Sequence, residues 1–298
     1  GAGSNLLVSD TGYAGLVIKN EIEGRSYTAG SQSTVLLTCG AGESWDAVVQ
    51  ETCERGLWGL ENLSAIPGTV GATPIQNVGA YGVEVAGLIR SVTAVHADTG
   101  AVRTFLPSEC AFAYRDSFFK TSVGRQWCIT QVTFALSTTS RPRLTYGDLT
   151  QLAQEQALTP QRIRETVVRI RAGKFPDWSV VGTAGSFFQN PIIPRSEGER
   201  LQAMYPDLPL YEVDAERVKV PLGWVLDHIC GLRGVCRNDV CLYAQQALVL
   251  VNQGATAAAA IDGFAAWVAA AVKQRTGLTI EREVRSIGFE LSPRERGE

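Results

Sequence analysis

The chain has 298 residues, of which 45% are hydrophobic and 19% are charged, a composition typical of a soluble globular protein rather than of a disordered one. Its net charge is -3, and it contains no basic block that could follow a phosphate backbone, so we expect no nucleic-acid partner. The most apolar stretch, Ala255 to Val272, is shorter than the ~20 residues that span a bilayer and contains Asp262, so we expect no membrane partner.

The length predicts two domains, at about 150 residues each, and the first half of the chain is rich in strand signals. Thr34–Thr38, Ile89–Val95 and Ile129–Leu136 are apolar and rich in β-branched residues, which favours strands. A helix is predicted from Ser44 to Gly56, with Ser44 as its N-cap. Strands with occasional helices over about 140 residues indicate an α+β fold.

The second half begins with a helix that Thr159 caps and Pro160 starts, and that ends near Gly173. A longer helix is predicted from about Thr256 to Arg275. Its apolar residues are spaced to lie on one face, and Gly277 terminates it. Leu278–Ile280 and Val284–Ile287 are predicted strands.

Two segments, Gly1–Asn5 and Ile66–Gly82, are rich in glycine. Glycines let backbone amides approach a ligand closely, and such amides suit a pyrophosphate, although tight turns without a ligand are the alternative. The dinucleotide fingerprint of a Rossmann fold is absent, because Leu6 stands where its third glycine belongs. A glycine loop normally follows a strand and nothing precedes Gly1, so we expect that an N-terminal segment is missing.

Several separate blocks of sequence are more specific than these loops. They are Gly59–Gly68, Pro74–Gly82, Phe112–Ser117, Leu144–Leu149, Ala184–Pro191, Gln245–Leu250 and Glu283–Arg285. In content, order and spacing they resemble the UDP-N-acetylenolpyruvoylglucosamine reductases, the MurB family. Leu208–Glu212 resembles the mobile tyrosine loop of one subtype of that family.

The resemblance implies an α+β protein of two domains. Residues 1–164 would form an FAD-binding domain of the vanillyl-alcohol-oxidase/PCMH type, without the β-α-β segment that normally precedes the first glycine loop. Residues 165–298 would form a smaller α+β substrate-binding domain, whose C-terminal strand contributes to the active site.

The resemblance also implies the reaction. NADPH would reduce FAD, and the flavin would reduce the enolpyruvyl ether of UDP-N-acetylglucosamine to UDP-N-acetylmuramate, a precursor of peptidoglycan. We therefore expect a monomeric enzyme of the bacterial cytoplasm with a small-molecule UDP-sugar substrate.

Three residues match the catalytic positions of the family: Arg115, Ser186 and Glu283. Arg115 and Glu283 would stabilise an enolate, and Ser186 would donate the proton. The residues alone favour a structural ion pair of Arg115 with Asp116 or another acid, and a turn serine at Ser186. The spacing cannot separate Glu283 from Glu281, and only the matching block selects Glu283.

Further residues fall on the ligand-binding positions of the family. Those expected to bind FAD are Gly3, Ser4, Asn5, Gly42, Pro67, Gly68, Gly71, Asn77, Gly79 and Gly82. Those expected to bind the UDP-sugar are Tyr146, Lys174, Asn190, Tyr211 and Gln246.

Two rival functions stay open at this stage. Another FAD oxidoreductase of the same flavin-domain type would lack the combination of Ser186, Asn190 and Gln246, which this chain has. A truncated, inactive UDP-sugar- or flavin-binding homologue would not need Arg115, Ser186 and Glu283 together, but the missing N-terminal segment keeps this alternative open.

The seven cysteines, an odd number, argue against a disulfide framework and fit a reducing compartment. Cys230, Cys236 and Cys241 lack the paired Cys-x-x-Cys spacing of a zinc site, so we expect no metal and predict small buried hydrophobic residues.

Overall fold

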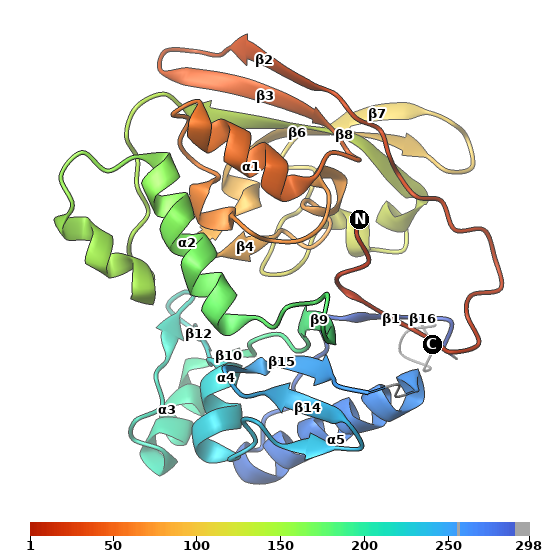
Figure 1. Ribbon diagram of the computed structural model, residues 1–298, viewed down its shortest axis with the longest axis vertical. Helices are drawn as coiled ribbons and strands as arrows, with labels where there is room; N and C mark the ends of the chain where they lie inside the picture. Colours follow the sequence, from red (N-terminus) through yellow and green to blue (C-terminus); the bar gives the residue numbers. More distant parts are fainter. Residues whose placement is uncertain (255–256, 290–298) are drawn as a thin grey trace. The chain divides into compact units, whose positions relative to one another are not determined.

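The computed structural model describes residues 1–254 and 257–289 (Figure 1). The chain divides into two compact units. The first unit comprises Gly1–Ala2 and Val17–Arg171, and the second comprises Gly3–Leu16 and the chain from Ala172 onwards. The assignment of FAD binding to residues 1–164 and of substrate binding to residues 165–298 stays a prediction.

The first unit contains a five-stranded antiparallel sheet in the order β2-β3-β8-β6-β7. The strands are β2 (Arg25–Ala29), β3 (Thr34–Gly40), β6 (Ile89–His96), β7 (Val102–Phe105) and β8 (Trp127–Ser137). The three strands predicted from sequence are β3, β6 and β8, and all are confirmed. They are the central strands of the sheet, which explains their apolar character.

Helix α1 (Trp45–Glu54) lies against one face of this sheet (Figure 1). Trp45 is 1% exposed, and its ring lies 5.8 Å from that of Phe134 on β8. Ser44 occupies the predicted N-cap position, but its side chain makes no capping hydrogen bond; its backbone instead forms a bridge with Thr69. The first unit also contains the hairpin β4 (Gly79–Ala80) and β5 (Val83–Glu84).

Short 3-10 turns connect these elements. They span Glu61–Leu63, Val70–Ala72, Val85–Gly87, Phe118–Lys120, Gly124–Gln126 and Gly147–Gln154.

Helix α2 (Pro160–Lys174) starts in the first unit. The predicted cap is confirmed, because Arg162 N donates a hydrogen bond to Thr159 Oγ1 (3.2 Å). Arg164 on α2 binds Asp46 on α1 through two hydrogen bonds of 2.6 and 2.8 Å. This bidentate pair ties the two helices of the first unit together.

The second unit contains a four-stranded antiparallel sheet in the order β13-β14-β15-β9. Its strands are β9 (Gly182–Ser186), β13 (Cys236–Arg237), β14 (Val240–Tyr243) and β15 (Gln246–Asn252). A three-stranded antiparallel sheet has the order β10-β12-β11, with β10 (Ile192–Pro194), β11 (Tyr211–Glu212) and β12 (Arg217–Lys219). The parallel pair β1 (Leu6–Val8) and β16 (Arg285–Ile287) joins the two ends of the chain.

The helices of the second unit are α3 (Arg195–Met204), α4 (Leu222–Trp224), the π-helix Val225–Ile229 and α5 (Ala258–Thr276). Figure 1 shows α5 along the four-stranded sheet, and its buried residues Phe264, Ala265, Val268 and Val272 confirm the predicted apolar face. Gly277 ends α5 with φ 81° as predicted, whereas Thr256, the predicted start, lies outside the described residues.

The strand predicted at Leu278–Ile280 is wrong, although β16 confirms the one predicted at Val284–Ile287. Leu278 and Ile280 are 2% and 8% exposed. Their alternation reflects packing in the core of the second unit rather than strand pairing. None of the helices within residues 1–254 and 257–289 combines the length and apolar character that a membrane crossing requires.

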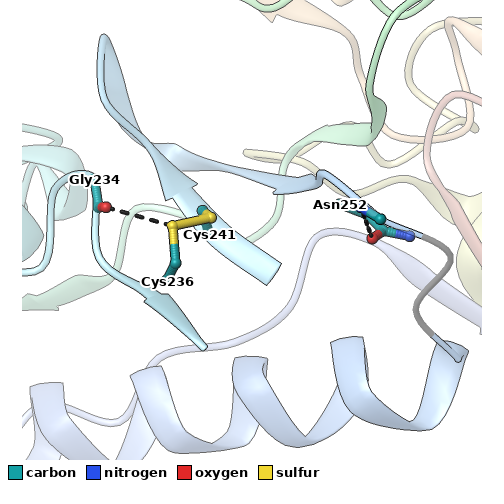
Figure 2. The surroundings of a disulfide bond; sticks show 5 residues. Gly234, Cys236, Cys241 and Asn252 are labelled. Atoms are coloured by element: carbon teal, nitrogen blue, oxygen red, sulfur yellow. Dashed lines mark hydrogen bonds between the residues drawn. A yellow bond between two sulfur atoms is a disulfide. The ribbon is translucent and has the colours of Figure 1, made fainter. Parts of the chain in front are cut away.

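The prediction for Cys236 is also wrong. Cys236 is exposed and forms a disulfide with Cys241, its direct partner across the β13–β14 hairpin (Figure 2). Residues that face each other across a hairpin are close enough for a disulfide without any sequence signature. Cys230 is partly buried and free, and no cluster of metal-binding side chains occurs among the residues that the structure describes.

Candidate active site

Arg115 stands in a tight turn of the first unit. Ala113 and Asp116 form a bridge through two backbone hydrogen bonds of 3.0 and 3.2 Å, and Arg115 is the third residue of this turn. Its φ is 54°, in the region that turns usually reserve for glycine or asparagine at this position. An arginine in this conformation stores strain, as is common at functional sites.

The Arg115 guanidinium is directed by the glycine loop. Arg115 Nη2 donates a hydrogen bond of 2.8 Å to Gly79 O, and a Cβ on Gly79 would lie 3.1 Å from Arg115 Nη1. Lys120 Nζ donates to Arg115 O (2.9 Å) and lies 4.0 Å from the Asp116 carboxylate. Lys120 therefore holds the backbone of the turn beside Arg115, and the choice between a ligand-binding and a structural role for Arg115 stays a prediction.

Asn77, predicted to bind FAD, links the loop to the same turn. It is 1% exposed, and its Nδ2 donates to Ala113 O (2.9 Å) and to Glu84 Oε2 (2.8 Å). Its Oδ1 accepts a bond from Ala86 N (3.0 Å). These contacts give Asn77 a role in holding the Arg115 turn.

The start of the Ile66–Gly82 loop is fixed by charged side chains. Ala65 has φ 56°; its amide donates to Asp46 Oδ1 (2.5 Å), and its carbonyl accepts from Arg171 Nε (3.1 Å). Burial would raise the pKa of Asp46, but the Arg164 guanidinium and the Ala65 amide outweigh burial and hold that pKa below its usual value. Burial lowers the pKa of Arg171.

The glycines predicted to bind FAD differ in what surrounds them. Gly68 has φ 127°, and a Cβ built there would meet no atom within 4 Å, so its backbone conformation requires glycine while the space beside it stays open. Gly71 and Gly42 are crowded by Ala41 and Glu21, and their amides donate to Ala41 O and Ile22 O. The segment around Gly68 therefore fits the close approach of a phosphate, whereas Gly42 and Gly71 are explained by packing.

The segments that carry Ser186 and Glu283 are hydrogen-bonded to each other in the second unit. Glu283 N donates to Phe187 O (2.9 Å), and Phe188 forms a bridge with Arg282. Ser186 is the last residue of β9 and is half-buried, and its hydroxyl makes no hydrogen bond with the described part of the chain. A hydroxyl without a protein partner is suited to donate to a ligand.

The Glu283 segment is held from two further sides. Asn5 Nδ2 donates to Glu283 O (3.2 Å), and Arg285 N donates to Asn5 O (3.1 Å). Arg282 forms an ion pair with Asp262 on α5. Sequence reasoning assigned Asn5 to FAD alone and missed this contact across 278 positions, for which no local signal exists.

The predicted substrate residues fall into both units. Asn190 Oδ1 accepts a bond from Leu222 N (2.9 Å) at the start of α4, and Gln246 Oε1 lies 2.9 Å from where a Cβ on Gly223 would stand. Asn190 and Gln246 therefore gather around one helix start. Tyr211 lies on β11, half-exposed.

The other two substrate residues are Lys174, the last residue of α2, and Tyr146. Tyr146 is in the first unit, where its ring packs edge-on against Tyr81 at 5.6 Å.

Comparisons with known proteins give consistent results. Residues 1–105 match the family model for an FAD-binding domain, and residues 177–287 match that for the C-terminal domain of UDP-N-acetylenolpyruvoylglucosamine reductase. A UDP-N-acetylenolpyruvoylglucosamine reductase of Porphyromonas gingivalis is 40% identical over 289 residues, which cover 96% of this chain and 85% of that protein. One of Pseudomonas aeruginosa is 41% identical over 286 residues, with 95% and 84% covered.

The crystal structure of UDP-N-acetylenolpyruvylglucosamine reductase (MurB) from Thermus caldophilus is similar with a TM-score of 0.61 at 24% identity. The similarity covers 96% of this chain and 83% of that one. Together with the domain matches, it confirms the predicted fold class: an α+β protein with an FAD-binding domain followed by a second α+β domain.

Proposed function

The chain belongs to the UDP-N-acetylenolpyruvoylglucosamine reductase family, and we propose that it reduces UDP-N-acetylglucosamine enolpyruvate to UDP-N-acetylmuramate in peptidoglycan precursor synthesis. The observation that carries this function is the identity of about 40% over 96% of the chain to named reductases. FAD, when bound, supplies the hydride that it receives from NADPH. The remaining chemistry falls to the residues of the chain.

Hydride addition to the terminal carbon of the enol ether leaves negative charge on the neighbouring carbon and its carboxylate. Arg115 stabilises this charge, because a planar guanidinium can bind a carboxylate through two hydrogen bonds. The bond from its Nη2 to Gly79 O fixes its direction before substrate arrives. Glu283 assists in holding the substrate carboxylate, and the bonds to its backbone from Asn5 and to Phe187 keep it in place.

Ser186 then gives its proton to the carbon next to the carboxylate, which completes the lactyl ether. A serine hydroxyl is a weak acid, but an enolate is a strong base, and a hydroxyl held at hydrogen-bond distance can protonate it. The absence of any hydrogen bond from the Ser186 hydroxyl to the described residues supports this role.

We further propose where the ligands bind. Residues 1–164 hold FAD, with Gly68 and Pro67 at the open part of the glycine loop, and residues 165–298 hold most of the UDP-sugar. The substrate contacts are those assigned above: Tyr146, Lys174, Asn190, Tyr211 and Gln246. We propose that the protein acts as a monomer in the bacterial cytoplasm, where NADPH and nucleotide sugars are found.

Flavin absorbance in rapid mixing tests this function. Without oxygen, protein reconstituted with FAD should oxidise more than one equivalent of NADPH per flavin only when the enolpyruvyl UDP-sugar is present. Ser186→Ala should leave flavin reduction by NADPH intact and slow the second half-reaction about 100-fold or more, the usual contribution of general acid catalysis. Ser137→Ala is the matched control, since Ser137 is also the last residue of a strand.

Each failure has its own meaning. Protein that cannot be loaded with FAD would contradict the enzyme assignment and favour an inactive homologue. Equal slowing of both half-reactions in Ser186→Ala would contradict the proton-donor role.

A further inference from the structure

Strand β9 is irregular immediately before Ser186. Ser186 pairs with Val249 and Thr183 pairs with Val251, so three steps along β9 match two steps along β15. The extra residue forms a β-bulge, and within it Gly185 has φ 76°. Bulges of this kind, with a left-handed glycine, change the direction of the side chains that follow.

The bulge decides the face on which Ser186 lies. Side chains alternate along a regular strand, so residues 183 and 186 would point to opposite faces. Here their partners, Val249 and Val251, lie on the same face and pack in one small cluster with Cys241. The extra residue therefore places Ser186 on the face of that cluster, away from the main core of the second unit.

The hydroxyl of Thr183 holds the bulge in shape. Thr183 Oγ1 donates to Leu250 O on β15 (2.8 Å) and accepts a bond from Gly185 N (3.1 Å). One hydroxyl thus bridges the neighbouring strand and the glycine of the bulge, using both its donor and an acceptor site.

We infer that Thr183 is a positioning residue for Ser186: by fixing the bulge at Gly185, its hydroxyl sets the direction from which Ser186 delivers the proton. The inference rests on the proposed role of Ser186 as proton donor. Thr183→Val keeps the shape of the side chain but leaves Gly185 N and Leu250 O without this partner. A displacement of a reacting group by about 1 Å can slow a reaction about 100-fold.

The test compares variants in the two half-reactions, followed by flavin absorbance. Thr183→Val should slow the second half-reaction about 10- to 100-fold and leave flavin reduction by NADPH unchanged. Thr183→Ser, which keeps the hydroxyl, should restore the wild-type rate to within about threefold. In the Ser186→Ala background Thr183→Val should cause no further slowing, because residues that act through one group are not additive.

Thr276→Val is a matched control. Thr276 Oγ1 also donates to a backbone oxygen, that of Val272 (2.8 Å), and accepts from a backbone amide, that of Leu278 (3.1 Å), in the same unit. Its loss should lower stability to a similar extent without changing either half-reaction. If Thr183→Val does not fold, Gly185→Ala replaces it: the added Cβ meets no atom within 4 Å, so only the strain at φ 76° is introduced, and the same selective slowing is expected.

The outcomes separate this inference from the function on which it rests. If Ser186→Ala slows the second half-reaction but Thr183→Val does not, or if the two effects multiply in the double variant, the inference is wrong. If Ser186→Ala itself has no effect, the proton-donor role is wrong and the inference falls with it.

Discussion

Replacing Arg115 by glycine and by alanine separates the strain of its turn from the chemistry of its guanidinium. Both variants lose the guanidinium and its 2.8 Å bond to Gly79 O. They differ only in how well they tolerate φ 54° at the third position of the Ala113–Asp116 turn. Any difference in stability between them therefore reports the backbone, and any loss of activity common to both reports the charge.

The size of each effect follows from the backbone conformation of the turn and the contacts of the guanidinium. A residue with a Cβ is destabilised by about 1–2 kcal/mol in the left-handed region, where glycine is not. Glycine also has more freedom in the unfolded chain, which reduces its advantage over alanine by about 0.5–1 kcal/mol. Arg115→Gly should therefore be more stable than Arg115→Ala by about 1 kcal/mol. The lost contacts of the guanidinium lower the stability of both variants equally, and the bond to Gly79 O accounts for about 1 kcal/mol of this loss. Removing a group that stabilises developing charge should slow the second half-reaction about 100- to 1000-fold in both.

Urea unfolding and rapid mixing with the enolpyruvyl UDP-sugar measure the two quantities on the same preparations. Arg115→Asn is a useful third variant, because asparagine tolerates positive φ better than alanine, and its stability should fall between the other two. Equal stability of the glycine and alanine variants would refute the strained turn. Near wild-type rates in either variant would refute the role of the guanidinium, whatever the stabilities show.

Two further predictions concern stability. The pKa of Asp46 is lowered in the folded state. The stability that the Asp46 carboxylate contributes is therefore present above its unfolded pKa of about 3.9 and is lost as the pH falls through the folded pKa. The free energy of unfolding of wild type should exceed that of Asp46→Asn by about 2 kcal/mol at pH 6, and urea titrations should show this difference disappearing below about pH 4. The Cys236–Cys241 disulfide closes a loop with a sequence separation of 5, which corresponds to about 2 kcal/mol of stability. Cys236→Ser should lower the free energy of unfolding by this amount in oxidising buffer only, and Cys128→Ser should leave it unchanged. A loss of stability that persists under reducing conditions would argue against the disulfide as its cause.

Local sequence patterns were sufficient for the elements that form the two cores. The strands at β3, β6 and β8 are central in their sheet and therefore carry the apolar and β-branched residues from which they were predicted. The end of α5 was predictable because glycine is the residue type that adopts the left-handed conformation of Gly277 at little cost. Leu278–Ile280 failed for the opposite reason: alternating burial identifies a segment that packs on a core, and it does not require a strand partner.

The candidate site also has a part that the sequence predicted and a part that it did not. The resemblance pointed to Arg115, Ser186 and Glu283 as separate residues, but the contacts that hold them come from distant positions in the chain. Asn5 reaches Glu283 from the other end of the sequence. Only Gly185 offered a local signal, since a glycine inside a strand pattern is a sign of a bulge.

A regular β9 would have been easier to predict and less useful. With an unbroken pairing to β15, the residue at position 186 would lie on the opposite face from Thr183, toward the side chains that fill the core of the second unit. A hydroxyl buried there would need a protein partner to offset its loss of water, and it would then be less able to give its proton to a substrate. The irregularity at Gly185 therefore lets Ser186 stand at the end of a strand paired with β15 while its hydroxyl has no protein partner among the described residues.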